Sequence, residues 1–201
     1  MALPDYTTQD AATYKANIDS SVADAVTPTS TDTLSNKTIN GGTIHHLTSV
    51  ACTTQSDIEF TGIPSWAKRI TIHFEAVSRS SNSQTVMYLS DASAGYASSG
   101  YHGGYQTITS GGQSVTGDNT TTIGLFGGVA DTAKHFTGQL VLTLMDPVTH
   151  KWTGQGAFYN NDATDVFYTC ACSADLTDDL DAIQISGTGT FDAGFINVCY
   201  E

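Results

Sequence analysis

Ser, His and Asp residues are plentiful in this chain, but their spacing matches none of the common catalytic motifs. The nearest approach to a nucleophile elbow is residues 112–117, Gly-Gln-Ser-Val-Thr-Gly, which misses the Gly-x-Ser-x-Gly spacing by one residue. The chain has no Gly-x-x-x-x-Gly-Lys phosphate loop and no His-Glu-x-x-His zinc motif. Because glycosidase-type carboxylates meet only in space, a depolymerase stays open as an alternative. We expect a protein that is not an enzyme and has no catalytic residues.

Two clusters carry side chains that bind metals elsewhere, without a complete metal motif. The acidic run Asp175, Asp178, Asp179 and Asp181 lacks the glycine and distal Glu of a calcium loop, so a solvated acidic turn is the simpler interpretation. The pair His45-His46 would meet its symmetry copies at the axis of a fibre, but no His-x-His repeats. We expect no metal site and no cofactor.

A third group of side chains suits binding. Tyr96, Tyr101, His102 and Tyr105 lie among Gly and Ser in the longest irregular tract, Ser90 to Asp118. Tyrosine rings on an adaptable backbone are typical of recognition loops, and rings stack on sugar faces. We predict that these four residues bind a receptor, a surface glycan first and a protein second. The alternative is an ordinary hairpin loop whose tyrosines pack on the fold.

Charge and cysteine content exclude several partners and sites. The formal net charge of −13 argues against nucleic acid, which requires clustered Lys and Arg. No apolar run is long enough to span a bilayer, and the amino end, Met-Ala-Leu-Pro-Asp-Tyr, lacks the features of a signal peptide. We expect synthesis in the cytosol and no membrane insertion. The four cysteines lack metal spacing, and buried reduced thiols are favoured over disulfides: Cys52, Cys170, Cys172 and Cys199.

The elements that must position these residues change character along the chain. From Ser56 onward apolar residues alternate with polar ones, as in Ile70 to Ala76, and Asp146-Pro147 marks a turn before a returning arm, Lys151 to Tyr159. Short strands between Gly, Asn and Asp favour a mainly β fold, and residues 47–201 are predicted to form a β-sandwich or jelly roll. Further strands are expected at 86–89, 121–126, 140–144, 166–171, 182–186 and 194–200.

The amino-terminal part has a helical period instead. A weak capping box at Thr7 and the proline at position 28 bound a predicted helix within residues 1–29. Its apolar stripe is narrow, which indicates either packing on its own domain or self-association and docking into a larger body. Residues 30–46 form a predicted extended connector. The residues expected to line a trimer axis or to attach to a particle are Ala11, Tyr14, Ile18, Val22, Leu34, Ile39 and Ile44.

Three segments, in the same order, resemble bacteriophage fibre proteins. Residues 31–39, Thr-Asp-Thr-Leu-Ser-Asn-Lys-Thr-Ile, are similar to a connector that recurs in those proteins. Residues 63–71, Ile-Pro-Ser-Trp-Ala-Lys-Arg-Ile-Thr, and the carboxyl end, Thr190 to Glu201 with its Phe-Asp-Ala-Gly run, resemble the same family. The match at the carboxyl end implies that the appendage ends at Glu201.

The resemblance implies a structural component of a virion, made in the host cytoplasm and exposed on the particle surface. We expect a short homotrimeric tail fibre or spike that attaches to another virion protein through its amino end. Its distal β domain, 47–201, would bind a host glycan or protein receptor. The alternative is a head fibre or capsid decoration without a specific receptor. The mainly β composition and the thin apolar stripe fit assembly by symmetry about an axis.

Overall fold

The computed structural model describes residues 44–81, 83–117, 119–127, 134–160 and 166–201. These residues form strands and no helix, so the expectation of a mainly β chain is confirmed for them. None of them belongs to a helix that is long and apolar enough to cross a bilayer. The predicted helix within residues 1–29, most of the connector, and six of the predicted axis residues lie outside the described residues: Ala11, Tyr14, Ile18, Val22, Leu34 and Ile39.

Nine strands form the larger sheet, sheet A, in the order β1-β14-β4-β10-β11-β12-β7-β8, with β2 also paired to β14. All of their pairings are antiparallel. The strands of sheet A are β1 (His45–His46), β2 (Val50–Ala51), β4 (Arg69–Arg79), β7 (Tyr101–Thr109), β8 (Gly112–Thr116), β10 (Phe136–Asp146), β11 (Lys151–Asn160), β12 (Val166–Asp175) and β14 (Phe191–Tyr200).

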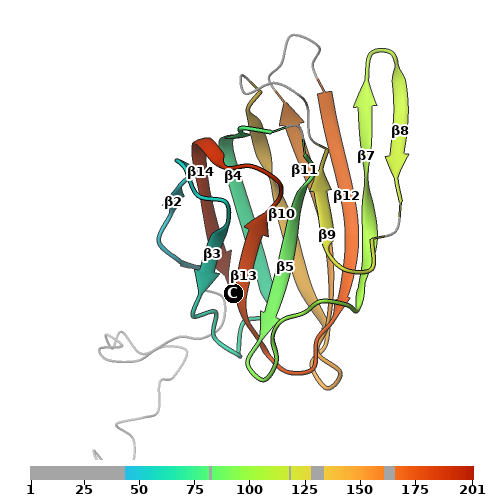
Figure 1. The fold of residues 1–201 in the computed structure, drawn as a ribbon. Coiled ribbons are helices and arrows are strands. Elements are labelled where there is room, and N and C mark those ends of the chain that lie inside the picture. Colours follow the sequence, from blue (N-terminus) through green and yellow to red (C-terminus); the bar gives the residue numbers. More distant parts are fainter. Residues whose placement is uncertain (1–43, 82, 118, 128–133, 161–165) are drawn as a thin grey trace, which may run out of the picture. The chain divides into compact units, whose positions relative to one another are not determined.

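Five strands form the smaller sheet, sheet B, in the order β3-β13-β5-β6, with β9 also paired to β5. Their pairings are antiparallel as well. Both sheets are open, and together they make two layers (Figure 1). The strands of sheet B are β3 (Ile58–Thr61), β5 (Thr85–Asp91), β6 (Gly95–Tyr96), β9 (Ile123–Phe126) and β13 (Leu180–Ser186).

Strand alternation read from the sequence places the core correctly. On β4, Ile70, Ile72 and Phe74 are buried, because side chains two residues apart point to the same face of a strand. β10 and β11 form the expected hairpin around Asp146-Pro147, in which the Asp146 carboxylate accepts a hydrogen bond of 2.8 Å from the Val148 N–H. The strands expected at 86–89, 121–126, 166–171, 182–186 and 194–200 also form, as parts of β5, β9, β12, β13 and β14.

Aromatic side chains join the two layers. Phe126 of β9 meets Phe74 of β4 edge to face, with ring centroids 5.9 Å apart, and stacks on Phe136 of β10 at 4.2 Å. Such ring pairs add to the free energy of burial. One hydrophobic core therefore lies between sheets A and B, and each sheet turns its other face away from it.

The tract from Ser90 to Asp118 is not the irregular loop that its Gly and Ser content predicts. It contains β6, β7 and β8, and β7 lies between β12 and β8 in sheet A. Glycines obscure the alternation because they carry no side chain that reports a face. Gly104 is required here, because a Cβ at this position would collide with the backbone oxygen of Thr116 on β8.

The amino-terminal edge of the fold also differs in detail from the expected boundary at residue 47. His45 and His46, which were assigned to the connector, form β1 and pair with Tyr200 and Cys199 of β14. The four cysteines are buried and free, which confirms the expectation of buried thiols.

Candidate binding face

The side of sheet A that faces away from sheet B is an exposed surface built from regular strands of the larger sheet. On β10, β11 and β12, its residues alternate with core residues such as Leu140, Phe158 and Tyr168. Apart from Lys151 and Asp175, which form an ion pair where β11 begins and β12 ends, the outward positions of these three strands carry no formal charge. We call these uncharged positions the outer face of sheet A: Thr137, Gln139, Val141, Thr143, Thr153, Gln155, Ala157, Tyr159, Phe167, Thr169, Ala171 and Ser173. In a chain with 20 carboxylates, this absence of charge is a distinct local property.

Strand register aligns outward residues into rows across the sheet. One row runs through paired positions on seven strands, where neighbours are about 4.8 Å apart. This row is Asn197, His73, Gln139, Ala157, Thr169, Gln106 and Val115. Side chains that can donate and accept hydrogen bonds thus lie in line across the strand direction.

A series of shallow hollows follows this row, which we call the trough. A hollow of about 420 Å³ lies between His73, Phe195 and Ala157, and one of about 340 Å³ adjoins it between Gln139 and Thr169. A third, of about 570 Å³, continues over β7 and β8. Adjacent hollows share lining residues, namely Gln139 and Ala157, then Gln155 and Thr169. The trough exists because the row holds small side chains between larger ones.

Three polar side chains along the trough, Gln139, Gln155 and Thr169, are not used by the described fold, whereas Asn197 and Gln106 bond to Leu47 and Gln113. Within the described part of the chain, Gln139, Gln155 and Thr169 make no side-chain hydrogen bond. A Gln amide offers two N–H donors and an acceptor oxygen, and a Thr hydroxyl offers one donor and two lone pairs. The trough therefore presents hydrogen-bonding groups on paired strands, with Glu75 as the one carboxylate among its lining residues.

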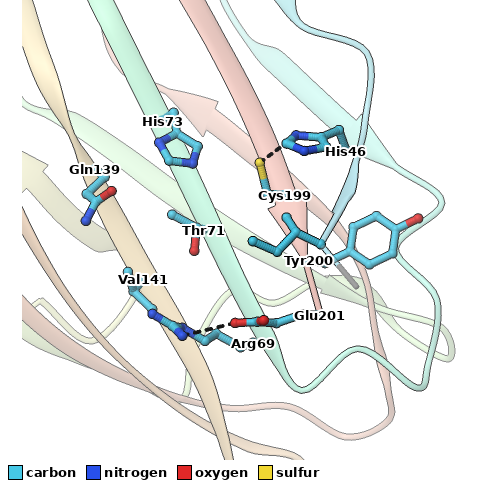
Figure 2. Close-up of a pocket in the computed structure, with 10 residues that line it drawn as sticks. His46, Arg69, Thr71, His73, Gln139, Val141, Cys199, Tyr200 and Glu201 are labelled. Atoms are coloured by element: carbon cyan, nitrogen blue, oxygen red, sulfur yellow. Dashed lines mark hydrogen bonds and ion pairs between the residues drawn. The ribbon is translucent and has the colours of Figure 1, made fainter. Parts of the chain in front are cut away.

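A separate cavity of about 300 Å³ lies at the corner of the same sheet, between β1, β14, β4 and β10 (Figure 2). At one side of it, the Sγ of Cys199 lies 3.0 Å from Nδ1 of His46. At the other side, Nη1 of Arg69 pairs with a carboxylate oxygen of Glu201 at 3.0 Å. Thr71, His73 and Gln139 lie between them. This corner cavity combines a thiol, imidazoles and an ion pair, which the trough does not.

Two of the predicted receptor-binding tyrosines are core residues, and the prediction is corrected for them. Tyr101 is fully buried, and its hydroxyl accepts a hydrogen bond of 2.8 Å from the Leu89 N–H and donates one of 3.2 Å to the Leu89 carbonyl. Tyr105 is 9% exposed and tilts against Tyr168. Because residues 101 and 105 share one face of β7, both rings enter the core. The alternative interpretation, in which the tyrosines pack on the fold, describes Tyr101 and Tyr105.

The other predicted site residues do not form one site with Tyr101 and Tyr105. Tyr96 is 37% exposed on β6 of sheet B, and its hydroxyl is hydrogen-bonded to Glu59. His102 is exposed on β7, opposite Ser173 of β12. Ile44, expected at a trimer axis, is 58% exposed and lines the corner cavity. The four predicted receptor residues are thus divided between the two sheets and the core.

The two clusters considered for metals have other partners in the structure. His45 packs between Trp66 and Tyr200, with ring centroids 5.2 and 5.4 Å away. In the acidic run, Asp175 pairs with Nζ of Lys151 at 3.0 Å, and Asp179 lies 3.4 Å from Nδ1 of His150. Among the described residues, no group of three His, Cys, Asp or Glu side chains is arranged to hold a metal ion.

The trough and the Cys199–His46 pair were missed by reasoning from the sequence. The trough residues belong to strands that alternation did predict, and their outward, uncharged character can be read from that alternation. What the sequence lacks is the register that aligns them. Comparison with known proteins adds nothing further: no family model matches this chain, and no curated protein or solved structure is detectably similar to it.

Proposed function

We propose that this protein is a structural component of a bacteriophage virion, a short fibre or spike that binds the host cell surface through the outer face of sheet A. Two observations support the proposal. The chain carries three segments that resemble phage fibre proteins, in the same order. The described residues present a broad, uncharged face on which Gln139, Gln155 and Thr169 make no side-chain hydrogen bond to another described residue, and this face is the observation that carries the proposal.

The chemistry of the trough favours a neutral glycan. Sugar hydroxyls match the amide and hydroxyl groups of Gln139, Gln155 and Thr169, and an uncharged ligand needs no ion pair. Phe195, which is 52% exposed, lines one end of the trough and offers an apolar surface for a sugar face. A protein receptor is the second ligand class. In this proposal the trough replaces Tyr101 and Tyr105 as the recognition surface.

The remaining features of the proposal follow from the resemblance. The protein assembles as a homotrimer, the two-sheet unit is a β-sandwich of jelly-roll type at the distal end, and residues 1–29 attach the protein to another virion component. Shallow sites such as the trough bind single sugars weakly. Three copies that engage one surface raise the overall affinity by multivalency, without new contacts.

The test fills the trough without disturbing the core. Ala157 is exposed in the middle of the row, so Ala157→Arg places a long charged side chain between Gln139 and Thr169. Thr61→Arg is the matched control, because Thr61 is exposed on a strand of sheet B. The full-length variants are compared for binding to cells of candidate hosts and to a panel of bacterial surface polysaccharides, together with mass and melting temperature.

We expect the wild type and Thr61→Arg to bind alike, and Ala157→Arg to lose about tenfold or more in affinity, as for a central interface residue. Unchanged binding by Ala157→Arg would remove the trough from the recognition site. Dissociation of the oligomer by Ala157→Arg would instead identify the outer face as a contact between copies. A wild type that binds no cell or polysaccharide above background would favour a capsid decoration.

A further inference from the structure

Cys199 is the only cysteine of the chain whose side chain lies on the face of its strand opposite the core. On β14, Ile196 and Val198 are fully buried, and Cys199 alternates with them to the opposite face. Cys170 and Cys172 share the inward face of β12 with Tyr168 and Ala174. Cys52 is fully buried. Of four buried thiols, one therefore lines a surface cavity with its side chain.

His46 lies opposite this thiol because of strand register. β1 pairs with β14 so that His46 faces Cys199, and directly paired residues of antiparallel strands bring their side chains together. The Sγ of Cys199 lies 3.0 Å from Nδ1 of His46, within hydrogen-bond reach, and the tautomer of the imidazole decides which of the two atoms donates. Asn197 adds a second contact, with its Oδ1 3.4 Å from Sγ.

Besides Cys199, the charged and titratable groups that line the corner cavity are His46 on β1, Arg69 and His73 on β4, Tyr200 on β14 and Glu201 after it (Figure 2). β10 contributes only the uncharged side chains of Gln139 and Val141. Arg69 is 54% exposed in its side chain, so its guanidinium can exchange Glu201 for a carboxylate that enters from solvent. The cavity of about 300 Å³ admits a small molecule and not a folded protein.

A base within hydrogen-bond reach affects the reactivity of the Cys199 thiol. Burial raises the pKa of the Cys199 thiol above its usual value, which disfavours the thiolate at neutral pH. The thiolate is the nucleophile in thiol chemistry, so a group that accepts the proton as the sulfur attacks speeds the reaction. His46 is the only imidazole in contact with Sγ among the described residues.

We propose that Cys199 and His46 form a thiol–disulfide exchange site for low-molecular-weight disulfides that carry a carboxylate. The Sγ of Cys199 attacks one sulfur of the disulfide while its proton passes to Nδ1 of His46. A new S–S bond forms to Cys199, the original S–S bond breaks, and the leaving thiolate takes the proton back from His46. No external oxidant is required, because one disulfide and one thiol give another disulfide and another thiol.

The experiment uses the reduced full-length chain under native conditions. Ellman's reagent, 5,5′-dithiobis(2-nitrobenzoate), is an aromatic disulfide with carboxylates, and its released thiolate is followed by absorbance between pH 6 and 9. Modified residues are located by peptide mass spectrometry. Oxidised glutathione serves as a second, aliphatic disulfide. The variants are Cys199→Ser, His46→Gln and, as a matched control on an inward face, Cys170→Ser.

We expect one thiol per chain to react ahead of the others and to map to Cys199. Cys199→Ser removes this fast phase and Cys170→Ser leaves it unchanged. His46→Gln keeps the thiol and slows the fast phase by roughly 10²-fold near neutral pH, and the loss shrinks as the pH rises, because a growing fraction of the thiol ionises without a base. Circular dichroism of each variant verifies the fold.

Two results would overturn the proposal. One is a wild-type Cys199 that reacts no faster than Cys52, Cys170 and Cys172. The other is a His46→Gln protein whose rate and pH profile match those of the wild type. That result would show that His46 contributes only to the pairing of β1 with β14 and does not accept the thiol proton. Mapping in the wild type decides the first point even if Cys199→Ser fails to fold.

Discussion

The glutamines at the centre of the outer face of sheet A differ from those on sheet B in whether they are hydrogen-bonded within the fold. On sheet B, Nε2 of Gln184 donates to Glu59 at 3.1 Å, and the hydroxyl of Tyr96 is hydrogen-bonded to the same carboxylate. On sheet A, Gln139 and Gln155 have no such partner within the described part of the chain. Polar groups that satisfy one another hold strands together, whereas groups left open are offered to a partner.

Asp91, at the end of β5, is the strongest example of a polar side chain that is satisfied by hydrogen bonds within the fold. It is 3% exposed, and its carboxylate accepts hydrogen bonds from the N–H and hydroxyl groups of Ser93 and Thr177 and from the Ala94 N–H at 2.7 Å. Burial alone would raise the pKa of Asp91, but these donors stabilise the charged form and lower the pKa well below 3.8. Asp91 thereby ties the end of β5 to the connection between β12 and β13.

The largest expected effect is therefore on stability and comes from Asp91→Ala. It removes the acceptor of the N–H and hydroxyl donors of Ser93 and Thr177 and of the Ala94 N–H, and a hydrogen bond to a charged group contributes about 1.5–3 kcal/mol. We expect the free energy of unfolding to fall by about 3 kcal/mol or more, as measured by denaturant titration. A change in the free energy of unfolding below about 1 kcal/mol would show that water replaces the carboxylate as acceptor and that Asp91 does not stabilise the sheet B side.

The pH dependence of stability tests the same carboxylate. Because the folded pKa of Asp91 is lowered, its charged form stabilises the fold above the usual value of 3.8, and this contribution is lost as the pH falls below that value. We expect the stability difference between wild type and Asp91→Asn to be constant from pH 7 to about 5 and to shrink toward pH 2. A difference that stays constant down to pH 2 would contradict the lowered pKa.

Tyr96→Phe is expected to have a smaller effect. Burial, followed by the carboxylate of Glu59, raises the pKa of Tyr96 to about 12, so the neutral hydroxyl is favoured in the fold. That stabilisation is present below pH 10 and is lost as the pH rises toward 12. Removing the partly exposed hydroxyl should cost about 1 kcal/mol or less at neutral pH. It should leave cell binding unchanged; a loss of binding would return Tyr96 to the recognition surface.

Gln155→Ala should have the smallest effect on stability. Its amide makes no hydrogen bond within the described residues, so we expect the free energy of unfolding to stay within about 0.5 kcal/mol of the wild type. Binding to the surface ligand should weaken at the same time. A destabilisation above about 1 kcal/mol would place Gln155 among the structural polar groups and end the contrast between the two faces.

The strands could be predicted where side chains report their faces. Ile70, Ile72 and Phe74 alternate with Thr71 and His73, and that part of β4 forms as expected. The same rule failed at β7, because Gly103 and Gly104 interrupt the alternation between Tyr101 and Tyr105. Tyr101 and Tyr105 are four residues apart, an even spacing that places both rings on the same face of a strand. This spacing is the sequence signal that could have predicted their shared face.

The candidate sites could not be predicted, because they depend on pairing between distant strands. The row from Asn197 to Val115 is fixed by register across seven strands, and no local pattern states that register. Cys199 and His46 are unremarkable in sequence and are 153 positions apart. Their contact follows only from the pairing of β1 with β14.

That long-range pairing has a consequence for how the chain acquires its shape. β14 lies between β1 and β4, so the corner of sheet A closes only when segments from opposite ends of the β unit meet. Loops of this length must close before their contacts stabilise anything, and folds dominated by such pairings fold in roughly milliseconds to seconds. We therefore expect the thiol pair and one end of the trough to be among the last features to form.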